Sequence, residues 1–277
     1  MKSLPMDARI RAPATTPPAA WRRGLAVLGR AALALGAVLL VWQLFTATTG
    51  LVSPNTFPAP SEVGGALRQI ATEGYANAPL YEHALRSVLL VTMGFAVAST
   101  IGVVLGLAMG ASRTVEALAN PVFLLLRPIP PLAWIPLAIV WLGLGDAAKI
   151  MVIFFAAFVP SVINSFTGVR QIERPIFEAA AMLGVSGPRL WREVLVPGAL
   201  PSIFTGLRLS LQASWTTLVA AELVGAVAGL GQILNQAAQD IYPGMIVVGM
   251  ASVALSGWLM TLMLGWLEQR VMPWKAR

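Results

Sequence analysis

RQIERPIFEAAAMLGVSGPRLWREVLVPGALP, residues 170–201, is the longest polar-rich interval after the first third of an otherwise mostly apolar chain. Helix-forming residues run from Ile176 to Leu183, and Gly184 suits the left-handed turn that ends a helix. Ser186-Gly187-Pro188 is typical of a second helix start, because proline is favoured near the first helical position. The interval therefore predicts two short helices joined by a tight turn.

The charges of this interval indicate a position in water. Arginines and glutamates are spread along it, so the segment is too polar for lipid. It is also too rich in helix signals for a slack loop. We expect a water-exposed element that contacts another protein, and the alternative is an ordinary polar connection between two membrane helices. The charged residues are Arg170, Glu173, Arg174, Glu178, Arg189, Arg192 and Glu193.

The composition is that of an integral membrane protein. The 277 residues are 57% hydrophobic and 11% charged, whereas a soluble domain has roughly 25% charged residues; the mean hydropathy is +0.75. The net charge of +7 does not indicate nucleic acid, because the basic residues are dispersed between apolar runs. The chain has no cysteine and one histidine, His83, so we expect no disulfide and no metal site.

Apolar runs of spanning length recur along the chain. The first follows a polar N-terminal tail, residues 1–24, whose composition does not favour an ordered structure. A cleaved signal peptide is the rival interpretation, and we disfavour it because the apolar run exceeds the usual length of about 7 to 15 residues. We predict an all-α membrane protein whose transmembrane domain, 25–277, has about six spans. They lie at about 25–47, 86–109, 118–144, 147–167, 202–224 and 245–267.

Six spans place both termini on one side of the membrane, and the basic residues indicate which side. Few of them lie on the side opposite the tail: Arg68, Arg86 and Lys149. We therefore expect the termini and the polar interval in the cytoplasm, in the inner membrane of a bacterium. The basic residues on the tail side are Lys2, Arg9, Arg11, Arg22, Arg23, Arg30, Arg113, Arg170, Arg174, Arg189, Arg192, Arg270, Lys275 and Arg277.

Two spans carry signs of special packing. Gly102, Gly106 and Gly110 recur every four residues, which predicts a flat ridge that another helix backbone can approach. The third span holds several prolines, which kink or break a helix and are tolerated where the freed carbonyls face protein or water. We interpret this span as lining a passage; a re-entrant or merely kinked packing helix is the alternative. The prolines are Pro121, Pro128, Pro130, Pro131 and Pro136.

The polar interval also carries a family motif. The spacing of Glu178, Ala179, Ala180, Gly184, Val194 and Pro197 resembles the EAA motif of permease subunits of ABC importers. That family usually has Ile at the position of Val194 and Leu at that of Val196, both conservative differences. The resemblance implies a type I importer-like bundle in which residues 170–200 are a coupling element that docks on the ATP-hydrolysing subunit. Gly184 would permit the sharp bend, and Pro197 would fix the start of the fifth span.

A second, less specific similarity is to one subfamily of these permeases. Residues 126–143, LRPIPPLAWIPLAIVWLG, look like the third span of importer permeases for taurine, aliphatic sulfonates, nitrate or bicarbonate. Ala221-Glu222, Gly229-Leu230-Gly231 and Pro273-Trp274 are similar as well, and the resemblance covers about residues 50–275. It implies a homodimer in the lipid bilayer, two ABC ATPase subunits and a periplasmic or extracellular substrate-binding protein.

The chain itself has no ATP-binding signature. No Gly-x-x-x-x-Gly-Lys sequence and no Gly-Lys pair occurs. We therefore expect no catalytic residue and no cofactor in this chain, with ATP and Mg bound by the partner ATPase. The energy for transport would arrive through the coupling element.

Polar residues within the spans are the candidates for the translocation path. An arginine inside a span usually faces a cavity or a partner, and the guanidinium group suits oxyanions. The alternatives for these arginines are snorkelling toward headgroups or pairing with a carboxylate such as Glu116. The candidates are Arg127, Trp134, Arg208, Ser214 and Thr217. Glu222 is a candidate for the outer gate or a binding-protein contact, and a surface helix cap is the alternative.

These observations favour the permease subunit of an ATP-driven importer for taurine, an aliphatic sulfonate or nitrate. Bicarbonate and a pyrimidine-type cargo are alternatives within the class. A membrane enzyme is disfavoured because the chain has no histidine pair, no cysteine, no paired aspartates and no Gly-x-Ser-x-Gly. A membrane scaffold is disfavoured because it needs neither polar residues within its spans nor the proline-laden third span.

Overall fold

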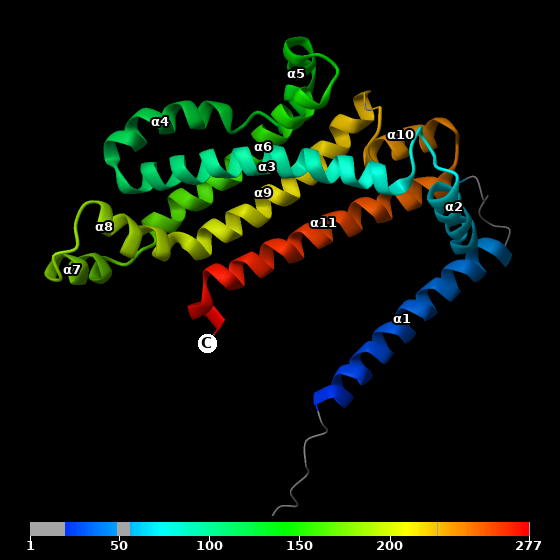
Figure 1. Cartoon of the computed structure of the whole chain (residues 1–277), viewed down its shortest axis with the longest axis horizontal. Helices are drawn as coiled ribbons and strands as arrows, with labels where there is room; N and C mark the ends of the chain where they lie inside the picture. Colours follow the sequence, from blue (N-terminus) through cyan, green and yellow to red (C-terminus); the bar gives the residue numbers. More distant parts are fainter. Residues whose placement is uncertain (1–19, 49–55, 226, 277) are drawn as a thin grey trace, which may run out of the picture.

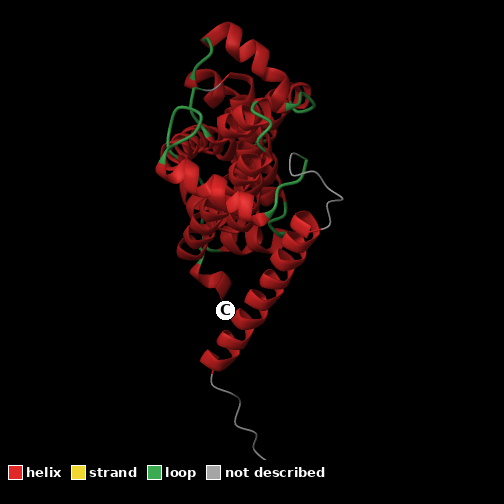
Figure 2. Ribbon diagram, turned by 90° about the vertical axis from the view of Figure 1, so that its right-hand side faces the viewer, coloured by secondary structure: helices red, strands yellow, loops and turns green. Residues whose placement is uncertain are grey.

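A computed structural model describes residues 20–48, 56–225 and 227–276. The predicted all-α class is confirmed: every regular element in these residues is helical (Figure 2). The predicted tail lies mostly outside the described residues. The helices are α1 Ala20–Thr48, α2 Pro60–Thr72, α3 Leu80–Ala111, α4 Arg113–Leu126, η1 Pro131–Trp134, α5 Ile135–Leu142, α6 Asp146–Arg170, α7 Arg174–Met182, α8 Pro188–Leu190, η2 Trp191–Leu195, α9 Val196–Gly225, α10 Leu230–Gln239, α11 Pro243–Val271 and η3 Pro273–Ala276.

Several of these helices are long and apolar enough to cross a membrane. Among the described residues four qualify alone, namely α3, α6, the continuous helix Pro188–Gly225 and α11. The pair formed by α4 and the segment Pro131–Leu142 qualifies together as a fifth. The first predicted span, 25–47, lies in α1, where the apolar segment found is the shorter Gly36–Thr46. The chain is therefore a multi-pass membrane protein.

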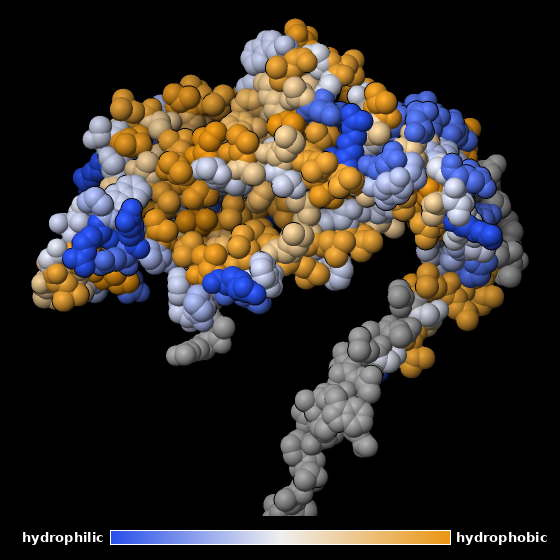
Figure 3. Space-filling model, viewed as in Figure 1, coloured by the Kyte–Doolittle hydropathy of each residue, from blue (hydrophilic) through white to orange (hydrophobic). Residues whose placement is uncertain are grey.

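The long helices run side by side and give the bundle two distinct ends (Figure 1). One end carries α7 and α8, and we call it the α7 end. The other carries α2 and α10, and we call it the α10 end. Hydrophobic surface dominates the face between them, with hydrophilic residues concentrated toward the ends (Figure 3). This is the distribution that a bilayer of about 30 Å hydrocarbon thickness selects.

The predicted glycine ridge on α3 packs against α6. A Cβ on Gly102 would lie 2.8 Å from Ser161 Cβ, and one on Gly106 would lie 2.5 Å from the carbonyl oxygen of Val162. Gly110 meets α6 in the same way. Real Cβ atoms do not approach so closely, so glycine is what lets the two backbones touch. The prediction of close packing is confirmed, and the structure identifies α6 as the partner.

Helix α6 also packs on α9 by similar means. A Cβ on Gly206 of α9 would lie 2.5 Å from Asn164 Cβ. One turn away, the hydroxyls of Ser161 and Ser210 share a hydrogen bond of 2.8 Å, and Ser210 also contacts the carbonyl oxygen of Ala157 at 2.7 Å. Because hydrogen bonds between helices persist in an apolar interior, α3, α6 and α9 form the central layer.

The expected third span, 118–144, is two helices. Helix α4 ends at Leu126, and the chain bends by 83° before Pro131 starts the next helical segment. Pro128 and Pro130 in the connection have no backbone N–H, and a proline disfavours helical geometry in the residue before it. The break therefore follows from the prolines.

The start of the fifth span differs from the expectation. Helix α9 does not begin at Pro197, because α8, a π-helical turn and α9 form one continuous helix, Pro188–Gly225. In the π turn, the N–H of Val196 donates to the carbonyl oxygen of Trp191. Proline at position 197 removes the next donor, and one wide turn accommodates this loss without ending the helix. The helix therefore extends from the α7 end to the α10 end.

Candidate functional site

The coupling element begins with a well-defined helix end. Helix α7 ends at Met182, Leu183 is its C-cap, and Gly184 adopts a φ of 69°. The N–H of Gly184 donates to Ala181 at 3.0 Å, and the N–H of Val185 donates to Ala180 at 2.9 Å. These two bonds are the Schellman arrangement, in which the residue after the cap is left-handed and glycine is preferred. The sequence-based expectation for Gly184 is confirmed.

The far tip of this element is apolar and exposed. The side chains of Met182 and Leu183 are 84% and 80% exposed, at the end of α7 that projects from the bundle (Figure 1). Glu178 and Ala179 are also exposed, whereas Ala180 is buried. Exposed apolar residues at one projecting tip are typical of a protein interaction surface.

The same element is firmly attached to the spans. Leu195 packs in a buried cluster with Val169 of α6 and Leu107 of α3, next to Phe177 of α7. The half-buried Val194 and Pro197 follow in the continuous helix. Arg170, the last residue of α6, forms an ion pair with Glu116 of α4. The coupling element therefore contacts the ends of α3 and α6 directly.

The candidates for the translocation path do not converge. Arg127 is exposed at the break after α4. Trp134 stacks on Phe155 of α6, with ring centroids 4.0 Å apart. Arg208 forms an ion pair with Glu268 of α11, so the alternative of a carboxylate partner applies to it, although the partner is not Glu116.

The two hydroxyl candidates are buried in the central layer. Ser214 has no exposed surface and donates to the carbonyl oxygen of Ser210 at 2.8 Å. Thr217 is 4% exposed. In this conformation both hydroxyls face protein, and neither lines an open passage.

Glu222 is enclosed at the α10 end, and its side chain has no exposed surface in this conformation. Ser87 of α3 donates to Glu222 Oε1 at 2.8 Å, and the N–H of Gly231 donates to Oε2 at 2.7 Å. Gly231 lies in the first turn of α10, so Glu222 caps this helix from within the bundle. The cap that the sequence suggested as an alternative is present, although it is buried and not on the surface.

Two further side chains complete this cap. Ser87 accepts from the N–H of Leu230 at 2.9 Å, and His83 Nδ1 accepts from the N–H of Gly229 at 2.9 Å. His83 Nε2 lies 2.9 Å from the carbonyl oxygen of Tyr75. Because Nδ1 accepts, Nε2 carries the proton and donates to that carbonyl. Three consecutive backbone amides are thus held by three fully buried side chains, and we call His83, Ser87 and Glu222 the amide clamp.

Sequence reasoning missed the amide clamp. It gave His83 no role, considered Glu222 for the outer gate, a binding-protein contact or a surface helix cap, and did not single out Ser87. The available signal was Gly229-Leu230-Gly231, because a Cβ at Gly229 would overlap the Glu222 carboxylate and one at Gly231 would lie 2.6 Å from Glu222 Cβ. Spacing alone does not tell which side chain approaches these glycines.

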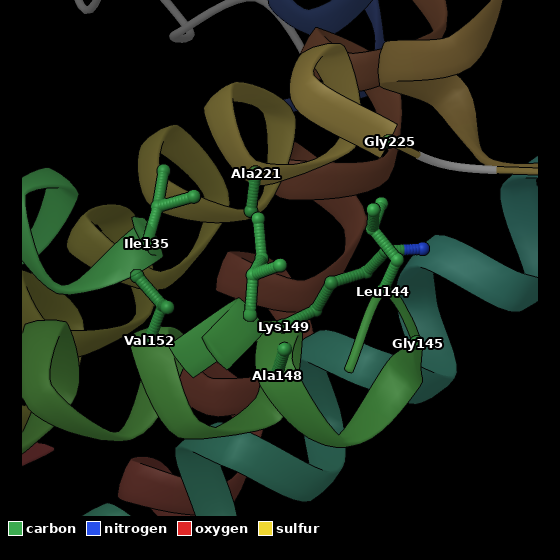
Figure 4. Close-up of a pocket in the computed structure, with 9 residues that line it drawn as sticks. Ile135, Leu144, Gly145, Ala148, Lys149, Val152, Ala221 and Gly225 are labelled. Atoms are coloured by element: carbon green, nitrogen blue, oxygen red, sulfur yellow. The ribbon is translucent and has the colours of Figure 1, made fainter. Parts of the chain in front are cut away.

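A charged cluster lies beside the amide clamp. Arg86 of α3 and Lys149 of α6 both approach Asp146, at 3.1 Å and 3.5 Å. The aliphatic part of Lys149 also lines a cavity of about 20 Å³ with Ala221 and Gly225 of α9 (Figure 4). A cavity of this size has room for about one water molecule.

Comparison with known proteins identifies the family of this chain. Residues 82–274 match the family of binding-protein-dependent transport system inner membrane components. The chain belongs to this family. It is 37% identical over 241 residues to the taurine transport system permease protein of Escherichia coli, covering 87% of each chain. It is 33% identical over 238 residues to the bicarbonate transport system permease protein of Synechococcus elongatus, covering 84% of this chain and 86% of that one.

As a member of this family the chain is the permease component of an ABC importer. The match starts at Glu82 in α3 and ends at Trp274 in η3, so it covers the central layer, the coupling element and the amide clamp. The identity predicted from the EAA spacing is confirmed.

Proposed function

We propose that this permease works as a homodimer that imports a small oxyanion, with two ATPase subunits at the α7 end and a substrate-binding protein at the α10 end. The family description supports the dependence on a binding protein. The names of two relatives, for taurine and for bicarbonate, support the class of cargo. Nitrate and other aliphatic sulfonates share the oxyanion chemistry and belong in the same test.

The continuous helix Pro188–Gly225 carries the mechanical part of this proposal. It starts in the coupling element and reaches the amide clamp through Glu222. A helix of this length and packing moves as a unit, because each of its ends is fixed by buried contacts. Motion of the ATPases at α7 would therefore reach the α10 end directly. ATP and Mg would be bound by those partner subunits.

The basic residues orient the bundle. The described side chains at the α7 end include Arg113, Arg170, Arg174, Arg189 and Arg192. The α10 end has fewer, namely Arg68, Arg86 and Lys149. Because cytoplasmic loops carry the excess of basic residues, we place the α7 end and both termini in the cytoplasm. The α10 end then faces the outside.

Coupling is tested with the whole transporter purified from cells. Glu178→Arg and Gly184→Asp should abolish ATP-driven uptake while the permease still inserts in the membrane, because both changes lie in the exposed coupling element. The ATPase should co-purify with the wild-type permease and be lost from the variants. Glu82→Gln, in the first turn of α3 at the opposite end, is the control and should keep the ATPase. Normal uptake by both coupling variants would refute the coupling role.

Orientation and cargo need separate measurements. A cysteine placed at Ser186 in the cysteine-free chain should resist a membrane-impermeant thiol reagent in intact cells and react after lysis. Labelling in intact cells would reverse the assigned topology.

For the cargo, uptake of taurine, ethanesulfonate, nitrate and bicarbonate should be measured in cells that lack their own systems. Uptake of none of the four would refute the oxyanion class.

A further inference from the structure

We propose that Arg86 and Lys149 form a binding site for the oxyanion group of the cargo, and that Asp146 occupies the place of that group while no cargo is bound. This inference rests on the proposed import of a small oxyanion and names the residues that would receive it. Asp146 is the first residue of α6, and both cations reach it from within two turns of the α10 end of their helices.

The carboxylate of Asp146 sits between the two cations. Arg86 Nη2 lies 3.2 Å from Oδ1 and 3.1 Å from Oδ2. Lys149 Nζ approaches Oδ1 at 3.5 Å from the other helix. A carboxylate, a sulfonate and a bicarbonate all present two or more oxygens on one centre, and a guanidinium group binds this geometry through several N–H donors. The observed pair therefore shows how an oxyanion would be held.

Lys149 is poorly satisfied for a buried cation. Its side chain is 7% exposed, and an ammonium group has three donors. Among the described residues, Asp146 at the long distance of 3.5 Å is its hydrogen-bond acceptor. Burying a charge is costly unless it is paired and hydrogen-bonded, so Lys149 has donor capacity for another oxygen.

The neighbouring carboxylate does not use that capacity. Glu222 Oε1 accepts from Ser87 and Oε2 accepts from Gly231, at 2.8 Å and 2.7 Å. The first turn of α10 further stabilises this negative charge. The amide clamp thus holds Glu222 for α10. Arg86 and Lys149 lie close enough to Glu222 to interact with it electrostatically, but the hydrogen bonds of both cations go to Asp146.

The cluster is accessible from the α10 end. The side chains of Arg86 and Asp146 are 41% and 43% exposed, so Asp146 has room to rotate away. The stem of Lys149 runs past Leu144, with its nitrogen beyond it (Figure 4). Ala221 and Gly225 of the continuous helix line the cavity beside that stem. Movement of this helix would alter the surroundings of Lys149, which connects the site to the coupling element.

The presence of both signs makes the site selective in a testable way. Ethanesulfonate carries a sulfonate alone, so it would bind Arg86 and Lys149 in place of Asp146. Taurine carries a sulfonate and an ammonium group, so it would bind the same two cations while Asp146 receives its ammonium group. The carboxylate therefore opposes the simple anion and favours the zwitterion.

The test uses the complete transporter, with its ATPase and binding protein, in proteoliposomes at saturating cargo. Arg86→Gln and Lys149→Met should each lower the uptake of ethanesulfonate about fivefold, the effect of losing one partly exposed ion contact. Lys149→Arg should retain uptake. Arg68→Gln is the control, because Arg68 is an exposed cation of α2 at the same end. Thermal unfolding of each variant shows whether it is folded.

Asp146→Asn gives the opposite signature. It should leave the uptake of ethanesulfonate unchanged or raise it, and it should lower the ratio of taurine uptake to ethanesulfonate uptake about fivefold. A ratio does not depend on the amount of folded protein. The proposed site is wrong if Asp146→Asn leaves the ratio of taurine uptake to ethanesulfonate uptake unchanged. It is also wrong if the folded Arg86→Gln and Lys149→Met variants take up as much ethanesulfonate as the control. If the wild type imports none of taurine, ethanesulfonate, nitrate and bicarbonate, the proposed cargo class fails instead.

Discussion

Glu222 accepts a hydrogen bond of 2.7 Å from the backbone N–H of Gly231, nine residues further along the chain. This contact closes the connection between α9 and α10 around a fully buried carboxylate. It explains why glycine stands at position 231, where a Cβ would lie 2.6 Å from Glu222 Cβ. The end of the continuous helix at the α10 end is thereby joined to the first turn of α10.

Glu222→Ala should destabilise the permease by about 1 to 3 kcal/mol, because it leaves buried donors of Ser87 and Gly231 without an acceptor. Glu222→Gln keeps one acceptor oxygen and should cost less. Unfolding of the purified protein in detergent, followed by intrinsic tryptophan fluorescence, measures the difference. Equal stability of the alanine variant and the wild type would show that the amide clamp contributes nothing to folding.

Gly106→Ala should destabilise the contact between α3 and α6. The added Cβ would lie 2.5 Å from the carbonyl oxygen of Val162, and overpacking of this kind costs about 1 to 3 kcal/mol. Gly265→Ala, within α11, is the matched control because a Cβ at that position would meet no neighbouring atom within 4 Å. The control should equal or exceed the wild type in melting temperature, since alanine is the better helix former. The reverse order of the two variants would contradict the packing.

Arg208 and Glu268 should depend on each other. Arg208→Met removes a charged hydrogen bond to the largely buried Glu268 and should cost about 2 kcal/mol. The double variant Arg208→Glu, Glu268→Arg restores opposite charges and should recover part of the loss. A double-mutant cycle that also contains the single variants Arg208→Glu and Glu268→Arg measures, from unfolding free energies, the coupling between α9 and α11. Additive effects of the two single changes would show that the pair is not coupled.

Tyr75 should resist ionisation. Burial, followed by its hydrogen bond to Asp240, raises the pKa of the Tyr75 phenol above the ordinary value near 10. The folded state thus holds this proton more tightly than the unfolded state. Its contribution to stability is complete below about pH 10 and is lost as the pH rises from there through the folded pKa.

A spectroscopic titration checks this behaviour. The chain has three tyrosines, and the last step in the phenolate absorbance should belong to Tyr75. Tyr75→Phe should remove that late step, whereas Asp240→Asn should shift it toward the ordinary range because the acceptor loses its charge. A late step that persists in Tyr75→Phe would assign it to another tyrosine.

Much of the fold follows from the sequence. Long apolar runs require helices that satisfy their own backbone groups in lipid. The glycines of α3 predict close packing, and the prolines between Pro128 and Pro136 predict a broken span. The turn at Gly184 follows from the preference of left-handed backbone for glycine. The EAA spacing was sufficient to predict the family. These features are local, so a single segment contains the information.

The tertiary structure alone decided which distant residues meet. It paired the ridge at Gly106 with α6, gave Arg208 the carboxylate of Glu268 and joined α8 to α9 in one helix. It also brought His83 and Glu222 to the first turn of α10. Most of these contacting residues lie tens of residues or more apart in the sequence. The spacing of residues along the chain was equally compatible with several other contact partners. Sequence determines what each helix can contact, whereas the packing of all the helices selects the contact.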